Sequence, residues 1–345
     1  MPMNLNEAAQ AIKKNFELVA AELAKIIVGQ DILIKHLFIG LLCGGHALIE
    51  GVPGLGKTLI VSSLSKILDL KYSRIQFTPD LMPADILGTN LVKEDSTGGR
   101  YFEFYKGPIF GQLILADEIN RASPKTQSAL LEAMQEERVT VFGAQHQLEP
   151  PFMVLATQNP IEMEGTYPLP EAQIDRFFFK LKINYPDQNE LRQILDKTTE
   201  DYRYELKRIV GADSILGMKS LVKKVPIATH VKDYAIRLVL ASHPGHAKAT
   251  EGIRKYVLCG ASPRGLQSLV MAGKVAALIG GRYNVALEDI REVAKPALRH
   301  RIMLNIRGET EGLDADDLVD EILATTNDSP VHSSYLAGER LKAKE

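Results

Sequence analysis

Apolar residues recur at steps of three and four along residues 5–27, which predicts an amphipathic helix. Gly29 is expected to end this helix, and a second helix is predicted over residues 31–42. The same spacing returns after residue 187, where no strong strand alternation is found, so a second, mainly helical domain is predicted. Its predicted helices cover residues 190–198, 214–224, 231–242, 262–279, 288–301 and 314–324.

Short continuous apolar runs lie between these helical regions. Residues 47–50, 112–118 and 152–159 are typical of strands buried on both faces of a parallel sheet. Two further strands are predicted at 72–77 and 178–183, and alternating segments predict hairpins at about 89–106 and 138–149. The predicted fold is therefore α/β. A parallel sheet with helices on both faces occupies residues 1–187, and a smaller helical domain with a polar tail occupies residues 188–345.

A glycine-rich loop follows the strand at 47–50. Residues 51–58 complete the pattern G-x-x-x-x-G-K-[ST], with a strand before them and a helical pattern after them. In this setting the loop amides and the helix N-terminus point at phosphate oxygens. Lys57 would reach the β- and γ-phosphates, and the Thr58 hydroxyl would bind Mg²⁺. The sequence therefore predicts a nucleoside triphosphate site.

Polar side chains follow two of the predicted strands at the sheet edge where α/β proteins bind ligands. Asp117 and Glu118 end one apolar run, and Asn159 ends another. Asp117 is predicted to hold the hydration shell of Mg²⁺, Glu118 to polarise the attacking water, and Asn159 to contact phosphate and orient water. A solvated acidic strand end is the alternative for the two carboxylates, and the complete phosphate loop argues against it.

Two arginines occupy defined local positions. Arg176 follows the segment 171–175, and in the simplest interpretation it pairs with Asp175 or with solvent. Arg264 comes after Ser262 and Pro263, a favourable N-cap and first helical residue, so it is expected in the first turn of a helix.

Composition narrows the function classes. The 345 residues carry a formal net charge of −2, which gives no whole-chain electrostatic case for nucleic acid or an anionic membrane. The sequence has neither an apolar run of spanning length nor a basic N-terminal leader, so the cytoplasm is expected. The two cysteines, Cys43 and Cys259, form no disulfide framework, and His243 with His246 fits a polar turn better than a metal site.

The order of these motifs resembles that of the AAA+ ATPases, over nearly the whole chain. Residues 117–127 and 165–173 resemble the MoxR group within that family. The resemblance implies an ATP- and Mg²⁺-binding Walker A motif and a Walker B pair at Asp117 and Glu118. It also implies a sensor-1 residue at Asn159, an arginine finger at Arg176 and a sensor-2 arginine at Arg264. The implied nucleotide-binding residues, including the adenine pocket at 28–30, are Val28, Gly29, Gln30, Gly51, Pro53, Gly54, Leu55, Gly56, Lys57, Thr58 and Leu59.

The resemblance also implies partners. Members usually form hexameric rings, and they are thought to remodel client proteins or load metal into them, often alongside proteins with von Willebrand A domains. The two hairpins resemble insertions that project toward the central pore in related machines.

Three other functions compete with this interpretation. A DNA-acting motor is disfavoured because the hairpin tips at 94–99 and 143–146 carry little positive charge, so no nucleic acid partner is expected. The motor subunit of a metal chelatase differs only in its partner and stays open. A scaffold that binds nucleotide but barely hydrolyses it is disfavoured by the intact Glu118, Asn159 and Arg176.

Overall fold

The computed structural model describes residues 5–160, 165–199 and 204–326, which form two compact units. One unit comprises residues 1–224 with 278–283, and the other comprises 225–277 with 284–345. The sequence predicted the boundary at residue 187, but residues 188–224 group with the first unit. Local contacts account for this, since Ile209 N donates to Ile67 O at 2.8 Å and Asn15 Nδ2 donates to the sulfur of Met218 at 3.6 Å.

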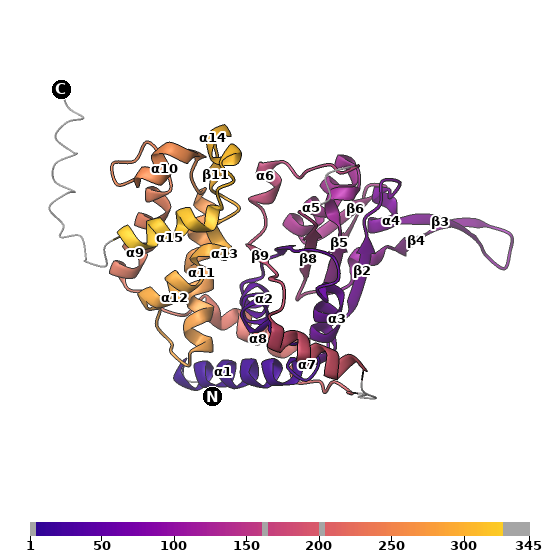
Figure 1. Cartoon of the computed structure of the whole chain (residues 1–345). Helices are drawn as coiled ribbons and strands as arrows, with labels where there is room; N and C mark the ends of the chain where they lie inside the picture. The colour runs from indigo at the N-terminus through magenta and orange to yellow at the C-terminus, as the bar shows by residue number, and fades with distance from the viewer. Residues whose placement is uncertain (1–4, 161–164, 200–203, 327–345) are drawn as a thin grey trace, which may run out of the picture. The chain divides into compact units, whose positions relative to one another are not determined.

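A five-stranded parallel sheet forms the centre of the first unit (Figure 1), and its strand order is β2-β5-β8-β1-β9. The predicted strands are confirmed to within two residues at each end. Three of them, β1, β5 and β8, are buried along nearly their whole length, because other strands flank them and helices cover the faces of the sheet. The bounds are β1 Ala47–Glu50, β2 Tyr72–Gln76, β5 Leu113–Asp117, β8 Met153–Gln158 and β9 Phe179–Lys182.

Helices cover this sheet, and most of them match the predicted ones. The first helix is shorter than predicted, because the backbone tightens to i→i−3 bonds when Ile26 N donates to Leu23 O at 3.0 Å. Gly29 (φ +72°) therefore lies in the following turn and caps no helix. The bounds are α1 Leu5–Leu23, α2 Asp31–Cys43, α3 Lys57–Ile67, α4 Pro83–Leu87, α5 Pro124–Glu136, α6 Glu171–Ile174, α7 Gln188–Thr199 and α8 Ala212–Val222, with 3₁₀ turns η1 Pro108–Phe110 and η2 Ile119–Arg121.

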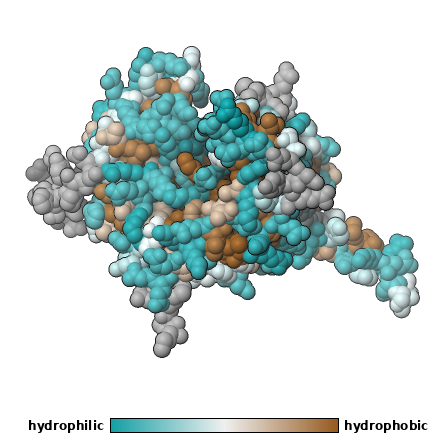
Figure 2. Space-filling view, turned by 60° about the horizontal axis from the view of Figure 1, so that its bottom comes forward, coloured by the Kyte–Doolittle hydropathy of each residue, from teal (hydrophilic) through white to brown (hydrophobic). Residues whose placement is uncertain are grey.

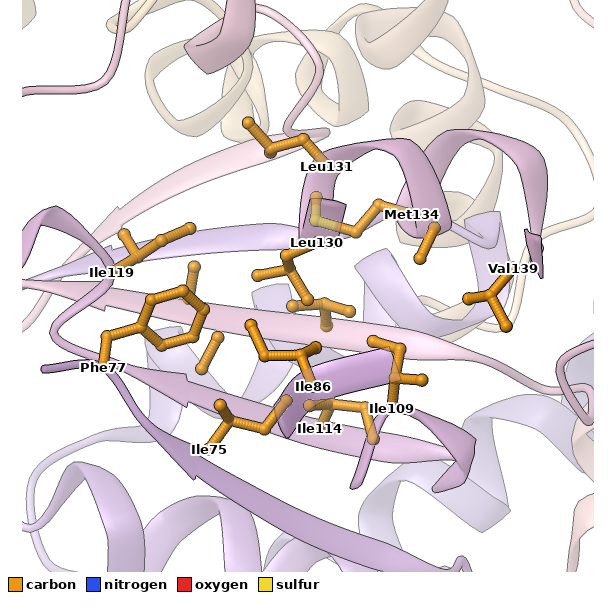
Figure 3. Packing of buried hydrophobic residues seen from close by; sticks show 14 of the residues in the cluster. Ile75, Phe77, Ile86, Ile109, Ile114, Ile119, Leu130, Leu131, Met134 and Val139 are labelled. Carbon is orange, nitrogen blue, oxygen red and sulfur yellow. The ribbon is translucent and has the colours of Figure 1, made fainter. Parts of the chain in front are cut away.

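One apolar cluster fixes α4 and α5 on the sheet. Ile86 of α4 and Leu130 of α5 are fully buried, and they pack with Ile114 of β5 and with Phe77, which follows β2 (Figure 3). Fully burying side chains of this size stabilises the fold by about 1.5–3 kcal/mol each. The cluster therefore holds rigid the strand ends from which Asp117 and Glu118 emerge.

Two hairpins extend from the unit, as predicted. One pairs β3 (Gly88–Glu94) with β4 (Arg100–Lys106) and forms a projecting arm, and the other pairs β6 (Arg138–Val141) with β7 (Ala144–Gln147) (Figure 1). Phe104 and His146 stack with ring centroids 3.9 Å apart, which links the bases of the two hairpins. Apolar surface is visible along the arm and polar surface at its end (Figure 2).

The second unit is mainly helical, with one short ribbon of two antiparallel strands that the sequence did not predict. The predicted helix 288–301 is two helices, because Val293 leaves the helical conformation (φ −94°, ψ 1°) and ends one as it begins the next. The bounds are α9 Thr229–Ala241, α10 Glu251–Tyr256, α11 Pro263–Ile279, α12 Leu287–Glu292, α13 Ala294–Leu298, α14 Ile306–Thr310, α15 Ala315–Thr325, β10 Val257–Cys259 and β11 Met303–Leu304.

A buried histidine links α5 to the sheet. His46 lies before β1, its Nε2 is 2.9 Å from Met134 O of α5, and its Nδ1 accepts a hydrogen bond from Val154 N of β8 at 3.0 Å. Because Nδ1 accepts, Nε2 must donate, and the ring is neutral in this arrangement. Burial lowers the pKa of His46 from 6.5 to about 4.

The stability of the fold should therefore fall in acid. Between pH 6.5 and 4 this ring is protonated in the unfolded chain but neutral in the folded chain. The free energy of unfolding therefore drops as the pH falls through this range. We expect a loss of about 2 kcal/mol between pH 7.5 and 5 from this group. Urea unfolding at both pH values measures it. His46→Gln should reduce the pH dependence, whereas His230→Gln at an exposed position should not. An undiminished pH dependence in His46→Gln would contradict the assignment.

Candidate nucleotide site

The loop between β1 and α3 has the shape of a phosphate cradle. Gly54 (φ +85°) and Gly56 (φ +73°) adopt left-handed backbone conformations that other residues rarely adopt, and a Cβ atom at either would meet nothing within 4 Å. Backbone conformation and not crowding therefore demands glycine here. Gly51 differs, because its Cβ would lie 3.2 Å from Ile183 Cβ, so close packing on the residue after β9 demands glycine there.

Lys57 is the first residue of α3, and its Nζ donates to Gly51 O at 2.5 Å across the loop. Thr58 and Leu59 follow in the first helical turn. The N-terminal amides of an 11-residue helix, the loop and one ammonium group thus converge on one open space. This donor set fits a polyphosphate, and the Thr58 hydroxyl and Asp117 are the candidate ligands of a divalent cation.

A cavity of about 520 Å³ lies beside the loop within the first unit. Its wall includes several exposed apolar side chains: Leu59 is 47% exposed, Leu191 of α7 41% and Tyr185 72%. An apolar pocket of this volume suits a nucleoside base. The lining residues are Ile26, Ile27, Val28, Gln30, Pro53, Gly54, Leu55, Gly56, Leu59, Ile60, Tyr185, Pro186, Leu191, Ile194, Lys197 and Thr198.

The sequence predicted only part of this wall. Val28 and Gln30 line the cavity as expected, whereas Gly29 is not among the lining residues and faces the Glu190 side chain. Neither Tyr185 nor the side of α7 that lines the cavity was predicted from the sequence. The apolar pair Leu191 and Ile194, one helical turn apart in a helix of low hydrophobicity, was the available signal.

Asp117 ends β5 and is held through both oxygens. Its Oδ1 accepts a hydrogen bond from Thr157 Oγ1 of β8 at 2.7 Å, and its Oδ2 accepts from Arg74 Nη2 of β2 at 2.6 Å. Thr157 Oγ1 in turn accepts from Glu118 N at 2.9 Å. Strands on both sides of β5 therefore orient this carboxylate.

Glu118 has a left-handed backbone (φ +57°), which turns its side chain out of the strand direction. Its Oε2 accepts hydrogen bonds from Gln76 Nε2 and from Arg121 Nη1, both at 2.9 Å. Four residues that hold these carboxylates were not predicted from the sequence: Arg74, Gln76, Arg121 and Thr157. The polar alternation of Arg74 and Gln76 at the end of β2 was the signal for two of them.

The structure brings Asn159 to the same sheet edge, because it directly follows β8, which pairs with β5 and β1. Asn159 is buried, with 6% of its surface exposed. Arg264 is exposed in the first turn of α11, as predicted, and belongs to the second unit.

Arg176 lies two residues after α6 and is exposed. It lines a cavity of about 320 Å³ together with Gln173 and the face of α5 that carries Glu132. Within the part of the chain that the structure describes, Arg176 forms no ion pair with Asp175, and its exposed side chain fits the other alternative, contact with solvent. The role of an arginine finger stays a prediction.

Two negative findings limit other chemistry. Across residues 5–160, 165–199 and 204–326, no cluster of three or more histidine, cysteine or acidic side chains could hold a metal ion by itself. A nucleotide-bound Mg²⁺ needs no such cluster, because phosphates and water supply most of its ligands. Over the same residues, none of the helices has the length and apolar character that crossing a membrane requires.

Comparison with known proteins identifies the family. A family model described as "ATPase family associated with various cellular activities (AAA)" matches residues 46–179, and an AAA lid domain model matches 251–322. Chaperone MoxR1 of Mycobacterium tuberculosis is 39% identical over 324 residues, which is 92% of this chain and 84% of that protein. The chain belongs to the MoxR-type AAA+ ATPases.

Other relatives of this MoxR-type ATPase agree. The uncharacterised protein YeaC of Bacillus subtilis is 42% identical over 304 residues, covering 87% of this chain and 90% of that protein. A crystal structure of a candidate ATPase from Cytophaga hutchinsonii is 42% identical, has a TM-score of 0.86, and matches 93% of this chain and 97% of that one. The resemblance and the fold class inferred from the sequence are therefore confirmed.

Proposed function

We propose that this MoxR-type ATPase hydrolyses Mg²⁺·ATP and uses the cycle to remodel client proteins as a homo-oligomeric, hexameric ring in the cytoplasm. The observation that carries the hydrolytic part is the arrangement of Asp117 and Glu118. Asp117 ends β5 and Glu118 follows it, at the same sheet edge as the phosphate cradle, where Lys57 begins α3.

In this proposal each residue group has one task. Val28, Gln30 and the apolar wall at Leu59 and Tyr185 hold the adenine, and the loop amides with Lys57 hold the phosphates. Thr58 and Asp117 hold Mg²⁺, which when bound neutralises charge on the phosphate oxygens.

Glu118 accepts a proton from the attacking water, and Asn159 orients that water toward the γ-phosphate. Glu118 suits this task because its left-handed backbone turns the carboxylate out of the strand. Arg176 stabilises charge on the transferring phosphoryl group of a neighbouring subunit, and Arg264 has the sensor-2 role that the family resemblance implies.

The client is a protein, and the two hairpins are the surfaces that meet it. The exposed side chains of the β3–β4 arm, among them Phe102 at 74% and Tyr105 at 67%, support this role because they present apolar surface on a projecting element. The proposal also includes loading of metal into the client and a partner protein with a von Willebrand A domain. The alternative is that the chain is the motor subunit of a metal chelatase, which differs in the partner that it engages.

Glu118→Gln tests the hydrolytic role. The amide keeps the size of the side chain but cannot take a proton, so we expect Mg²⁺·ATP affinity to stay within about twofold while turnover falls at least about 100-fold. Calorimetry measures the first quantity and phosphate release the second.

Glu17→Gln at an exposed position of α1 is the matched control and should leave turnover unchanged. Turnover near wild type in Glu118→Gln would show that another group activates water. The same variant, held in its ATP-bound state, should retain clients in affinity capture.

A further inference from the structure

The carboxylate of Asp117 is already paired with a cation of the chain itself. Arg74 Nη2 lies 2.6 Å from Asp117 Oδ2, and the same nitrogen donates to Gln76 Oε1, also at 2.6 Å. The Asp117 side chain is only 13% exposed, whereas that of Arg74 is 46% exposed. The carboxylate therefore sits in a protected place, and the guanidinium can move into solvent.

This pairing places a cation on one of the two oxygens that a metal could use. Asp117 Oδ1 accepts a hydrogen bond from the neutral Thr157 hydroxyl, whereas Oδ2 carries the charged guanidinium. A divalent cation, or a water molecule of its hydration shell, requires an acceptor oxygen without a cation already on it. A guanidinium and Mg²⁺ on the same carboxylate would also repel each other, because both carry positive charge.

We propose that Arg74 is an internal counter-ion that competes with Mg²⁺ for Asp117, so that the metal binds only as this ion pair opens. The inference rests on the proposed Mg²⁺·nucleotide site and names a positioning residue for it. Arg74 keeps Asp117 paired in the metal-free chain and lowers the affinity of the site for the metal.

Gln76 extends the effect of this pair to Glu118. Its Oε1 accepts from Arg74, and its Nε2 donates to Glu118 Oε2 at 2.9 Å, so one amide joins the two carboxylates. When Arg74 leaves Asp117, the amide loses the donor that fixes its orientation. Metal arrival at Asp117 thus weakens one of the two hydrogen bonds to Glu118, and the pair with Arg121 remains.

The chain supplies a matched comparison. Arg121 pairs with Glu118 at 2.9 Å and is 43% exposed, similar to Arg74, whereas the guanidinium on Asp117 is that of Arg74. Removing either arginine removes one positive charge near the site, and only removal of Arg74 frees the Asp117 oxygen. Arg208, paired with Asp69 on the surface, serves as a second, remote control.

The experiment measures the affinity for the fluorescent nucleotide mant-ADP with Mg²⁺ and with EDTA, and takes the ratio as the contribution of the metal. We expect this ratio to rise about 3- to 10-fold in Arg74→Gln, as one partly exposed charged pair warrants. It should rise less than about twofold in Arg121→Gln and stay unchanged in Arg208→Gln.

The proposal that Arg74 competes with Mg²⁺ would be wrong if the Mg²⁺-to-EDTA affinity ratio in Arg74→Gln were unchanged or lower. An equal rise of this ratio in Arg121→Gln would contradict it as well. Retained mant-ADP affinity in EDTA shows that the variant is folded, and Arg74→Met, which keeps an apolar stem, is a second variant. A wild-type ratio near one would instead reject the proposed metal site, so the two failures are distinguishable.

Discussion

Replacing Arg176 by alanine should leave ATP binding intact and lower the rate of hydrolysis about 10³-fold, the lower end of the range for an arginine finger. The physical reason is that an exposed guanidinium without an ion pair among the described residues costs the fold little to lose. In the proposed role its charge acts on the γ-phosphate of a neighbouring subunit. Phosphate release at saturating ATP, with binding measured by calorimetry, tests both halves of this expectation.

Mixing should then rescue activity if the residue acts across the interface. A Lys57→Ala subunit still carries Arg176, and an Arg176→Ala subunit still carries an intact phosphate loop. In a mixed ring the Lys57→Ala subunit supplies Arg176 to the intact phosphate loop of the Arg176→Ala subunit. The rate of ATP hydrolysis by the mixture should therefore exceed that of either variant alone. Arg208→Ala, which removes another exposed arginine of the first unit, is the control and should retain full activity. A mixture that co-assembles and stays inactive would disprove action in trans.

Lys57→Ala should abolish measurable binding of ATP, with affinity lowered at least about 100-fold. The ammonium is the single cationic side chain of residues 51–58, and charge-assisted bonds to two phosphates are worth about 3–6 kcal/mol together. This ammonium also donates to Gly51 O within the loop, so the alanine variant loses that part-buried hydrogen bond, and it should still fold. Calorimetry with Mg²⁺·ATP measures the loss.

Lys66→Ala provides the matched control for this prediction. Lys66 is exposed in the last turn of the same helix, away from the phosphate loop, so its loss should change ATP affinity less than twofold. Tight binding by Lys57→Ala would remove the phosphate-loop assignment, whereas equal loss in both variants would point to a destabilised α3.

The sequence by itself determined the features that local pattern encodes. The five strands, the loop at 51–58 and the carboxylate pair Asp117–Glu118 could be read directly, because each depends on contiguous residues with one chemical requirement. Buried parallel strands must be apolar, left-handed loop positions favour glycine, and polar residues at strand ends mark the ligand edge. The family resemblance rested on these same residues.

Only the tertiary structure decided which distant residues meet. Arg74, Gln76 and Thr157 surround the carboxylates because the strand order β2-β5-β8 places β5 between two strands that lie far from it in sequence. The cavity wall on α7 and the unit boundary after residue 224 likewise depend on packing between separate segments. The local propensity of a segment does not determine which distant segment it contacts, because strand order and register are set by burial summed over the whole sheet.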